Sequence, residues 1–233
     1  MNYCERLLDR KIDKKLQSTL YTKSRKASMK YMQKKRFFLF MLISVMALLE
    51  TVNAENFKVG LTATPWGAND VLRFATVDGG ADYSGNGFYM LGISFQIPMS
   101  SRLDLETGVE YSKHTILIAP ELFPGSMDRT PYKSKLNLMS IPVTLKLNFL
   151  KYLFVNGGCL LDLDTSTSSS IDDQTGLGAI LGFGIKYDFK FGGTIFVNPY
   201  IACHSLVPFS PAHYQQRLSE SGIRIGFVYN ISI

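Results

Sequence analysis

Glu110, Ser112 and His114 occupy alternate positions, and their residue types suit catalysis better than any other set in this sequence. A serine close to a histidine and a carboxylate can become the activated nucleophile of an acyl-transfer reaction. If the segment is a strand, alternate side chains share a face but start about 7 Å apart, because the rise is ~3.4 Å per residue. That spacing exceeds the roughly 3 Å over which a nucleophile and its base interact. We therefore predict that these residues line a polar face of a sheet, and that the chain has no catalytic residues.

The other histidines and a group of carboxylates offer little further chemistry. His204 and Ser205 lie near the end of one segment and His213 follows it, so we interpret them as solvated loop residues. Four carboxylates near a long connection could bind Ca²⁺, although they lack the glycine-centred spacing of a calcium loop. They are Asp162, Asp164, Asp172 and Asp173. Since no CxxC or Cys/His metal-binding spacing occurs either, we expect no metal and no cofactor.

After residue 55 the chain alternates between apolar and polar residues in eight segments. In one of them Ile141, Val143 and Leu145 alternate with Thr144 and Lys146. Alternation of period two predicts strands whose two faces meet different surroundings. Several segments are long enough for the ~9–11 residues that a tilted strand needs to cross a bilayer. The segments are residues 56–64, 86–97, 103–115, 134–148, 152–163, 176–189, 194–206 and 220–233.

Short and long connections alternate strictly between these segments. Residues 98–102, 149–151 and 190–193 are tight, whereas the other connections are long and rich in Gly, Ser, Pro and Asp. An even number of strands, with short turns on one side and long loops on the other, is typical of outer-membrane barrels. Many of the 19 glycines, all of which follow residue 54, share the polar phase, where small residues make room inside a narrow barrel. We predict an all-β fold, an eight-stranded antiparallel up-and-down transmembrane β-barrel.

A soluble periplasmic lipocalin-like carrier remains the alternative fold, because its strands also alternate. Pro142 lies inside a predicted strand, where it removes a hydrogen bond of the ladder, so we expect a β-bulge there. Aromatic residues near the segment ends are expected to form the interfacial girdles of a membrane barrel. They are Phe57, Phe88, Tyr89, Tyr111, Tyr152, Phe189 and Tyr229.

The N-terminal region predicts export. Lys34, Lys35 and Arg36 precede an apolar run over residues 37–49, and small residues end at Ala54. This order is that of a secretory signal peptide, and the run is short for a membrane-spanning anchor. We predict a signal peptide over residues 29–54 and a barrel over residues 55–233. Residues 1–28 are interpreted as a misassigned start or a disordered basic extension.

The positive charge is concentrated in the same region. Residues 1–36 contain twelve Lys and Arg and three acidic residues, whereas residues 55–233 contain thirteen Lys and Arg and fifteen acidic residues. The predicted mature chain is therefore slightly acidic, which gives no basis for nucleic-acid binding. Its expected location is the outer membrane of a Gram-negative cell, and its expected partners are outer-membrane lipids and lipopolysaccharide, with other envelope or secretion proteins as further partners.

One stretch of the chain resembles a known family. The run "LNLMSIPVTLKLNFLKYLFVNGGCLLD", with Ile141-Pro142, Lys146 and residues 156–158, is similar to the PorT-like outer-membrane β-barrel proteins of Bacteroidota. The run "GLGAILGFGIKYDF" and the closing "IGFVYNISI" are similar to later strands of that family. The resemblance implies an OmpA-OmpX-like barrel and implies no enzymatic activity. Its founding member assists protein secretion.

The polar phase carries nearly balanced charges. Eight strands leave an interior just wide enough for side chains, and buried charges must pair or lose a large hydration energy. We therefore predict ion pairs that plug the lumen, which leaves a structural, adhesion or secretion-assisting envelope role for the loops. A lipid-modifying acyl hydrolase or acyltransferase is the alternative function. The predicted lumen residues are Lys58, Asp104, Glu106, Glu110, Lys146, Asp162, Lys186, Asp188 and Arg224.

The last segment alternates up to its final residue. Ile223, Ile225, Phe227 and Tyr229 share one phase, and smaller or polar residues fill the other. We predict that this strand pairs with the first one, closes the barrel and serves as its assembly signal.

Overall fold

The computed structural model describes residues 56–74, 81–120, 130–166, 171–210 and 215–232. No helix in these ranges is long and apolar enough to cross a bilayer. Their regular structure consists of eight β-strands. The strands are β1 (Asn56–Arg73), β2 (Asp82–Pro98), β3 (Leu103–Ala119), β4 (Tyr132–Asn148), β5 (Leu153–Asp164), β6 (Gly176–Asp188), β7 (Gly193–Pro208) and β8 (Gln216–Ser232).

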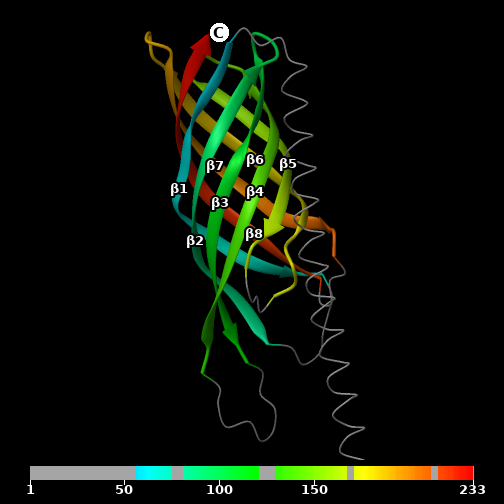
Figure 1. Ribbon diagram of the computed structural model, residues 1–233. Helices are drawn as coiled ribbons and strands as arrows, with labels where there is room; N and C mark the ends of the chain where they lie inside the picture. The colour runs from blue at the N-terminus through cyan, green and yellow to red at the C-terminus, as the bar shows by residue number, and fades with distance from the viewer. Residues whose placement is uncertain (1–55, 75–80, 121–129, 167–170, 211–214, 233) are drawn as a thin grey trace, which may run out of the picture. The chain divides into compact units, whose positions relative to one another are not determined.

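Each strand is antiparallel to its neighbour in sequence, and β8 pairs with β1 to close the barrel (Figure 1). The closing pairs run from Asn56 opposite Ser232 to Arg73 opposite Gln216. The predicted eight-stranded up-and-down barrel is therefore confirmed. The predicted closing partner of the last strand is also the observed one.

The two ends of the barrel differ, as the connections predicted. Residues 99–102, 149–152 and 189–192 join β2 to β3, β4 to β5 and β6 to β7. We call this the turn end; it also holds the start of β1 and the end of β8. At the opposite end, the loop end, the connections span residues 74–81, 120–131, 165–175 and 209–215.

Strand β1 is twice as long as predicted. The sequence suggested an end at Thr64, since Pro65 follows, but β1 continues to Arg73. Its register shifts between Ala63 and Gly67 against β8, and between Thr64 and Gly67 against β2. The proline thus falls within a β-bulge, where its missing N–H costs no ladder hydrogen bond.

The bulge expected at Pro142 is absent, so that prediction was wrong. The pairing of β4 with β5 runs without a shift from Leu138 to Asn148, and Pro142 faces Leu160. Against β3 the register is the same on both sides of the proline, from Thr107 opposite Val143 to Glu110 opposite Ser140. The strand therefore tolerates the missing N–H locally, without inserting an extra residue.

The outer face of the barrel is apolar. On β6, for example, Leu181, Phe183 and Ile185 are more than half exposed, whereas the alternate glycines face inward. Exposed aromatic rings gather at the turn end, where Tyr152 stacks on Tyr187 and Phe189 on Phe191. A closed barrel with an apolar exterior and an aromatic girdle meets the requirements of a bilayer, because no strand edge is left unpaired in lipid. The protein is an outer-membrane barrel.

Inward-facing glycines make room for two large rings. A Cβ atom at Gly226 would lie 2.3 Å from the Phe196 ring, and one at Gly184 would lie 2.3 Å from the Phe154 ring. Both rings are buried, and with Val228 they form a small apolar cluster inside the lumen. The glycines of the polar phase thus serve packing inside the barrel, as predicted from the narrow interior.

Candidate functional site: the charged lumen

The lumen is filled by layers of polar side chains, which we describe from the turn end to the loop end. In the first layer, Lys58 lies 3.5 Å and Lys186 lies 3.3 Å from the half-exposed carboxylate of Asp188. Thr194 donates a 2.6 Å hydrogen bond to the same carboxylate. Asp104 has no cationic partner within the described residues, and it accepts a 2.8 Å hydrogen bond from an amide at the end of β4.

The second layer centres on Lys146, whose side chain is only 1% exposed. Its ammonium lies 3.2 Å from Glu106 and over the rings of Phe154 and Phe196, at 4.2 and 5.0 Å from their centroids. Glu106 also accepts a hydrogen bond from Asn156 at 3.1 Å. The lysine therefore exchanges its hydration for one carboxylate and two aromatic faces.

The third layer is the pair of Arg224 on β8 and Glu110 on β3. The guanidinium donates a 3.0 Å hydrogen bond to the carboxylate, and both side chains are less than 10% exposed. The guanidinium also covers the ring of Tyr200, 4.7 Å from its centroid. Strands β3 and β8 are not neighbours, so this pair spans the lumen.

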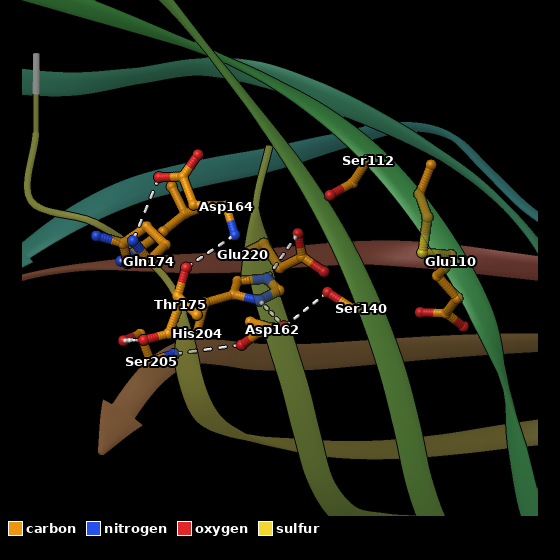
Figure 2. A network of polar contacts seen from close by, with 12 residues as sticks. Glu110, Ser112, Ser140, Asp162, Asp164, Gln174, Thr175, His204, Ser205 and Glu220 are labelled. Carbon is orange, nitrogen blue, oxygen red and sulfur yellow. Dashed lines mark hydrogen bonds and ion pairs between the residues drawn. The ribbon is translucent and has the colours of Figure 1, made fainter. Parts of the chain in front are cut away.

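The fourth layer contains two histidines and two carboxylates, all buried. Figure 2 shows three of them, His204, Asp162 and Glu220. His204 lies between the two carboxylates, with Nδ1 3.0 Å from Asp162 and Nε2 3.3 Å from Glu220. His114 approaches the same oxygen of Glu220, with Nε2 at 3.4 Å. Our interpretation of His204 and Ser205 as solvated loop residues was therefore wrong. His213 lies outside the described residues.

His204 continues the inward phase of β7, and a β-bulge directly follows it. Three residues of β7, 204–206, face the single residue Gly178 of β6. Ser205 adopts φ 49°, an uncommon conformation for a residue other than glycine. This geometry brings the Ser205 N–H to 3.3 Å from Asp162. Bulges re-aim side chains in this way, and alternation alone does not reveal them.

Ser112 and His114 do contact each other, contrary to the separation expected for alternate residues. The serine Oγ lies 2.9 Å from the histidine Nε2, because the side chains lean toward each other. The arrangement is still not that of a nucleophile triad, in which the carboxylate binds the second ring nitrogen. Here Glu220 approaches the same Nε2, while Nδ1 of His114 has no hydrogen-bond partner among the residues that the structure describes. Both residues are also buried, so a lipid ester has no path to the hydroxyl.

An apolar cap closes the lumen at the loop end. Ile116, Leu136, Leu218 and neighbouring apolar side chains form a buried cluster that Ile171 joins from the β5–β6 connection. Gln174 from the same connection is fully buried and donates a hydrogen bond to the backbone of β8. Residues 171–175 of this connection therefore fold into the barrel mouth.

The acidic residues considered for Ca²⁺ do not converge. Asp162 belongs to the histidine layer, whereas Asp164 accepts hydrogen bonds from the backbone of Ser166 and Gln174. Asp173 accepts hydrogen bonds from Thr175. Among the described residues, the only group of three or more side chains with metal-ligand spacing is a different one, formed by His114, His204 and Glu220.

Sequence reasoning missed three lumen residues. Tyr200 and Glu220 were not assigned to the interior, although Tyr200 donates a 3.0 Å hydrogen bond to Glu220 there. Phe88 was expected in a girdle, but it is buried and stacks on His114 with ring centroids 4.8 Å apart. Phe88 shares the inward phase of β2 with Met90, and the register of β2 against β3 shifts just before it, between Gly85 and Phe88. The alternation of residues along β7 places Tyr200 on the inward face, and this pattern could have assigned it to the lumen.

Neither protein-family models nor curated proteins match this chain. Among solved structures, the chain is similar to the outer membrane protein AlkL, with 15% identity, a TM-score of 0.43, and coverage of 75% of this chain and 90% of AlkL. It is similar to OprG of Pseudomonas aeruginosa with 14% identity and a TM-score of 0.44, covering 76% and 96%. It is also similar to Ail, the attachment invasion locus protein of Yersinia pestis, with 10% identity, a TM-score of 0.34, and coverage of 75% and 99%.

Proposed function

We propose that the protein is a closed outer-membrane scaffold that acts through its loop end and conducts nothing through its lumen. The observation that carries this proposal is the Arg224–Glu110 pair across the lumen, with the Lys146–Glu106 layer beside it. Between these two layers the described residues leave an internal cavity of about 20 Å³. That volume is close to the minimum for one water molecule.

The long connections then carry the biological role. A rigid barrel presents loops at one end of the molecule, and binding residues concentrate on loops that a rigid scaffold positions. The role is structural, adhesive or secretion-assisting. Outer-membrane lipids and lipopolysaccharide surround the barrel, and other envelope or secretion proteins are the proposed loop partners. The PorT-like resemblance of the stretch around Pro142 supports the secretion-assisting role within a Bacteroidota envelope.

The two alternatives find less support. A lipid-modifying enzyme would need an accessible nucleophile, yet Ser112 and His114 are buried and lack triad geometry. A lipocalin-like carrier would need a ligand cavity in the lumen and a polar exterior. The layers around Lys146 and Arg224 leave no room for a ligand cavity in the lumen, and the exterior of the barrel is apolar.

We also propose that residues 29–54 are a cleaved signal peptide and that residues 1–28 do not belong to the mature protein. These residues lie outside the described part of the chain. The basic residues followed by a short apolar run support this assignment.

Shortening a long loop should separate the scaffold from its function. Residues 121–129 connect β3 to β4, and Ile118 pairs with Tyr132 just inside that connection. A short Gly/Ser turn in place of these residues should therefore leave the barrel folded. We expect the shortened protein to reach the outer membrane at wild-type levels and to fail to complement the envelope or secretion defect of a deletion strain.

Lipid A mass spectrometry of the same strains distinguishes the enzymatic alternative. We expect identical lipid A masses in the wild-type, deletion and complemented strains. A mass change that depends on Ser112 would support the lipid-modifying function instead. Full complementation by a protein with all four long connections shortened would contradict the loop-based role.

A further inference from the structure

We propose that His114, His204 and Glu220 bind one divalent transition-metal ion, of the zinc class, inside the barrel. The three side chains come from β3, β7 and β8, and each is buried. Two imidazoles and one carboxylate form a donor set that zinc accepts in proteins. This set cannot be recognised from a sequence motif, because each of the three ligands lies on a different strand.

The distances between the donor atoms suit a tetrahedral ion. Glu220 Oε2 lies 3.4 Å from His114 Nε2 and 3.3 Å from His204 Nε2. Two donors that each lie ~2.0–2.1 Å from a tetrahedral zinc ion are separated by about 3.3 Å. All three donor atoms lie within 4.8 Å of one another, so a small side-chain movement completes the triangle.

The surrounding residues orient these ligands as second-shell partners do in metal sites. Asp162 lies 3.0 Å from Nδ1 of His204, which leaves Nε2 of that ring to face Glu220. Ser140 donates a 2.6 Å hydrogen bond to Asp162 (Figure 2). Tyr200 donates one of 3.0 Å to the other oxygen of Glu220. Carboxylate–histidine–metal arrangements fix ring orientation in the same way.

Unpartnered atoms provide a second, independent observation. Within the described ranges, Oε2 of Glu220 and Nε2 of His204 have no hydrogen-bond partner of acceptable geometry, although they lie 3.3 Å apart. A buried polar atom without a partner is costly, and a shared ion between these atoms would satisfy both. Ser112 Oγ lies 2.9 Å from Nε2 of His114, beside the proposed site.

Charge balance favours a divalent cation over an empty cluster. Two carboxylates, Asp162 and Glu220, face the two imidazoles in this layer, while the nearby Glu110 is already paired with Arg224. A divalent ion bound by neutral imidazoles balances the negative charges of these two carboxylates, so that the buried layer carries no net charge. Figure 2 shows His204 between Glu220 and Asp162, with one ring nitrogen facing each carboxylate.

The position of the site suggests what the ion does. Strands β3 and β7 are separated by three strands in either direction around the ring, so His114 and His204 lie on opposite walls. An ion that binds both of them links the two walls across the lumen, directly below the apolar cap. Because its ligands are buried, the ion would have no access to a substrate, and we infer that it stabilises the folded barrel.

Cobalt substitution tests the proposal on the complete mature protein refolded in detergent. We expect wild type to retain one Co²⁺ or Zn²⁺ per chain after gel filtration and to show the intense visible absorption of tetrahedral Co²⁺. His114→Gln and His204→Gln should each lose that absorption. His213→Gln is the matched control, since His213 is the only other histidine in the sequence, and it should bind like wild type.

Heat-modifiable gel migration shows whether each variant has folded. If either glutamine variant fails to fold, X-ray absorption spectroscopy of zinc-loaded wild type replaces it, and we expect two imidazole ligands at ~2.0–2.1 Å. Folded wild type that retains no metal would overturn the proposal. Metal that remains bound with both histidines replaced, or a zinc spectrum without imidazole ligands, would also overturn it.

Discussion

Deletion of Tyr229–Ile233 is expected to abolish membrane insertion of the barrel. In the closed structure Tyr229 faces Val59 of β1, and the pairs continue to Ser232 opposite Asn56. Tyr229 also faces Gly193 at the start of β7. Without these residues the turn end of β1 keeps a row of unpaired N–H and C=O groups. Each unpaired group in hydrocarbon costs several kcal/mol, so the open barrel cannot compete with the unfolded chain.

The measurement is the fraction of chain that migrates as the folded species before heating and resists protease in isolated outer membranes. We expect less than about a tenth of the wild-type fraction, because a few unpaired groups already exceed the 5–15 kcal/mol stability of a typical domain. Deletion of five residues from a long loop, Met127 to Pro131 being one choice, is the control for chain length and should be tolerated. Normal insertion of the C-terminally truncated chain would contradict the closing role of β8.

Arg224→Glu should destabilise the barrel more than the same change at an exposed arginine. The substitution removes the partner of Glu110 and adds a second carboxylate beside it in a buried layer. Removal of one member of a buried pair costs about 3–5 kcal/mol, and repulsion between the two carboxylates adds to that cost. We expect at least this loss in the free energy of unfolding, measured by denaturant titration in detergent micelles.

Arg102→Glu is the matched control, because Arg102 is exposed in the turn between β2 and β3. Exposed substitutions of this kind change stability by about 0.5 kcal/mol or less. The charge-swapped double variant, Arg224→Glu with Glu110→Arg, should recover part of the lost stability, since it restores opposite charges across the lumen. Equal losses at residues 224 and 102 would remove the case for a paired lumen.

The alternation of residue types was sufficient to predict the architecture. A period of two separates lipid-facing from lumen-facing residues in every strand, which is why Lys146 and Arg224 could be assigned to the interior. Loop lengths then predicted which strand ends lie together. Neither signal depends on long-range contacts, so both can be read from a single sequence.

The partners inside the lumen could not be predicted in the same way. Register shifts in β1, β2 and β7 interrupt the alternation along these strands, so that Ser205 is buried directly after the inward-facing His204. The contact between Ser112 and His114 depends on side-chain direction rather than on backbone spacing. Glu220 contacts both His204 and His114. In the sequence, Glu220 follows His114 by more than a hundred residues. No local pattern encodes such a meeting.

Pro142 illustrates the opposite error. A local rule predicted a bulge, but the strand keeps its register on both sides. The pairs with β5 continue through the proline, so the rest of the ladder holds the strand in place. The rule on proline predicts a missing hydrogen bond and does not decide how the sheet accommodates it.

Single-channel recording tests the closed lumen most directly. The complete mature protein, refolded in detergent and shown to be folded by heat-modifiable migration, is added to a planar lipid bilayer in concentrated salt. We expect no stable conductance steps, because the Lys146–Glu106 and Arg224–Glu110 layers and the apolar cap around Leu218 occupy the lumen. Stable, sizeable single-channel steps from the wild-type protein would show that ions pass through these layers, and would contradict the plugged scaffold.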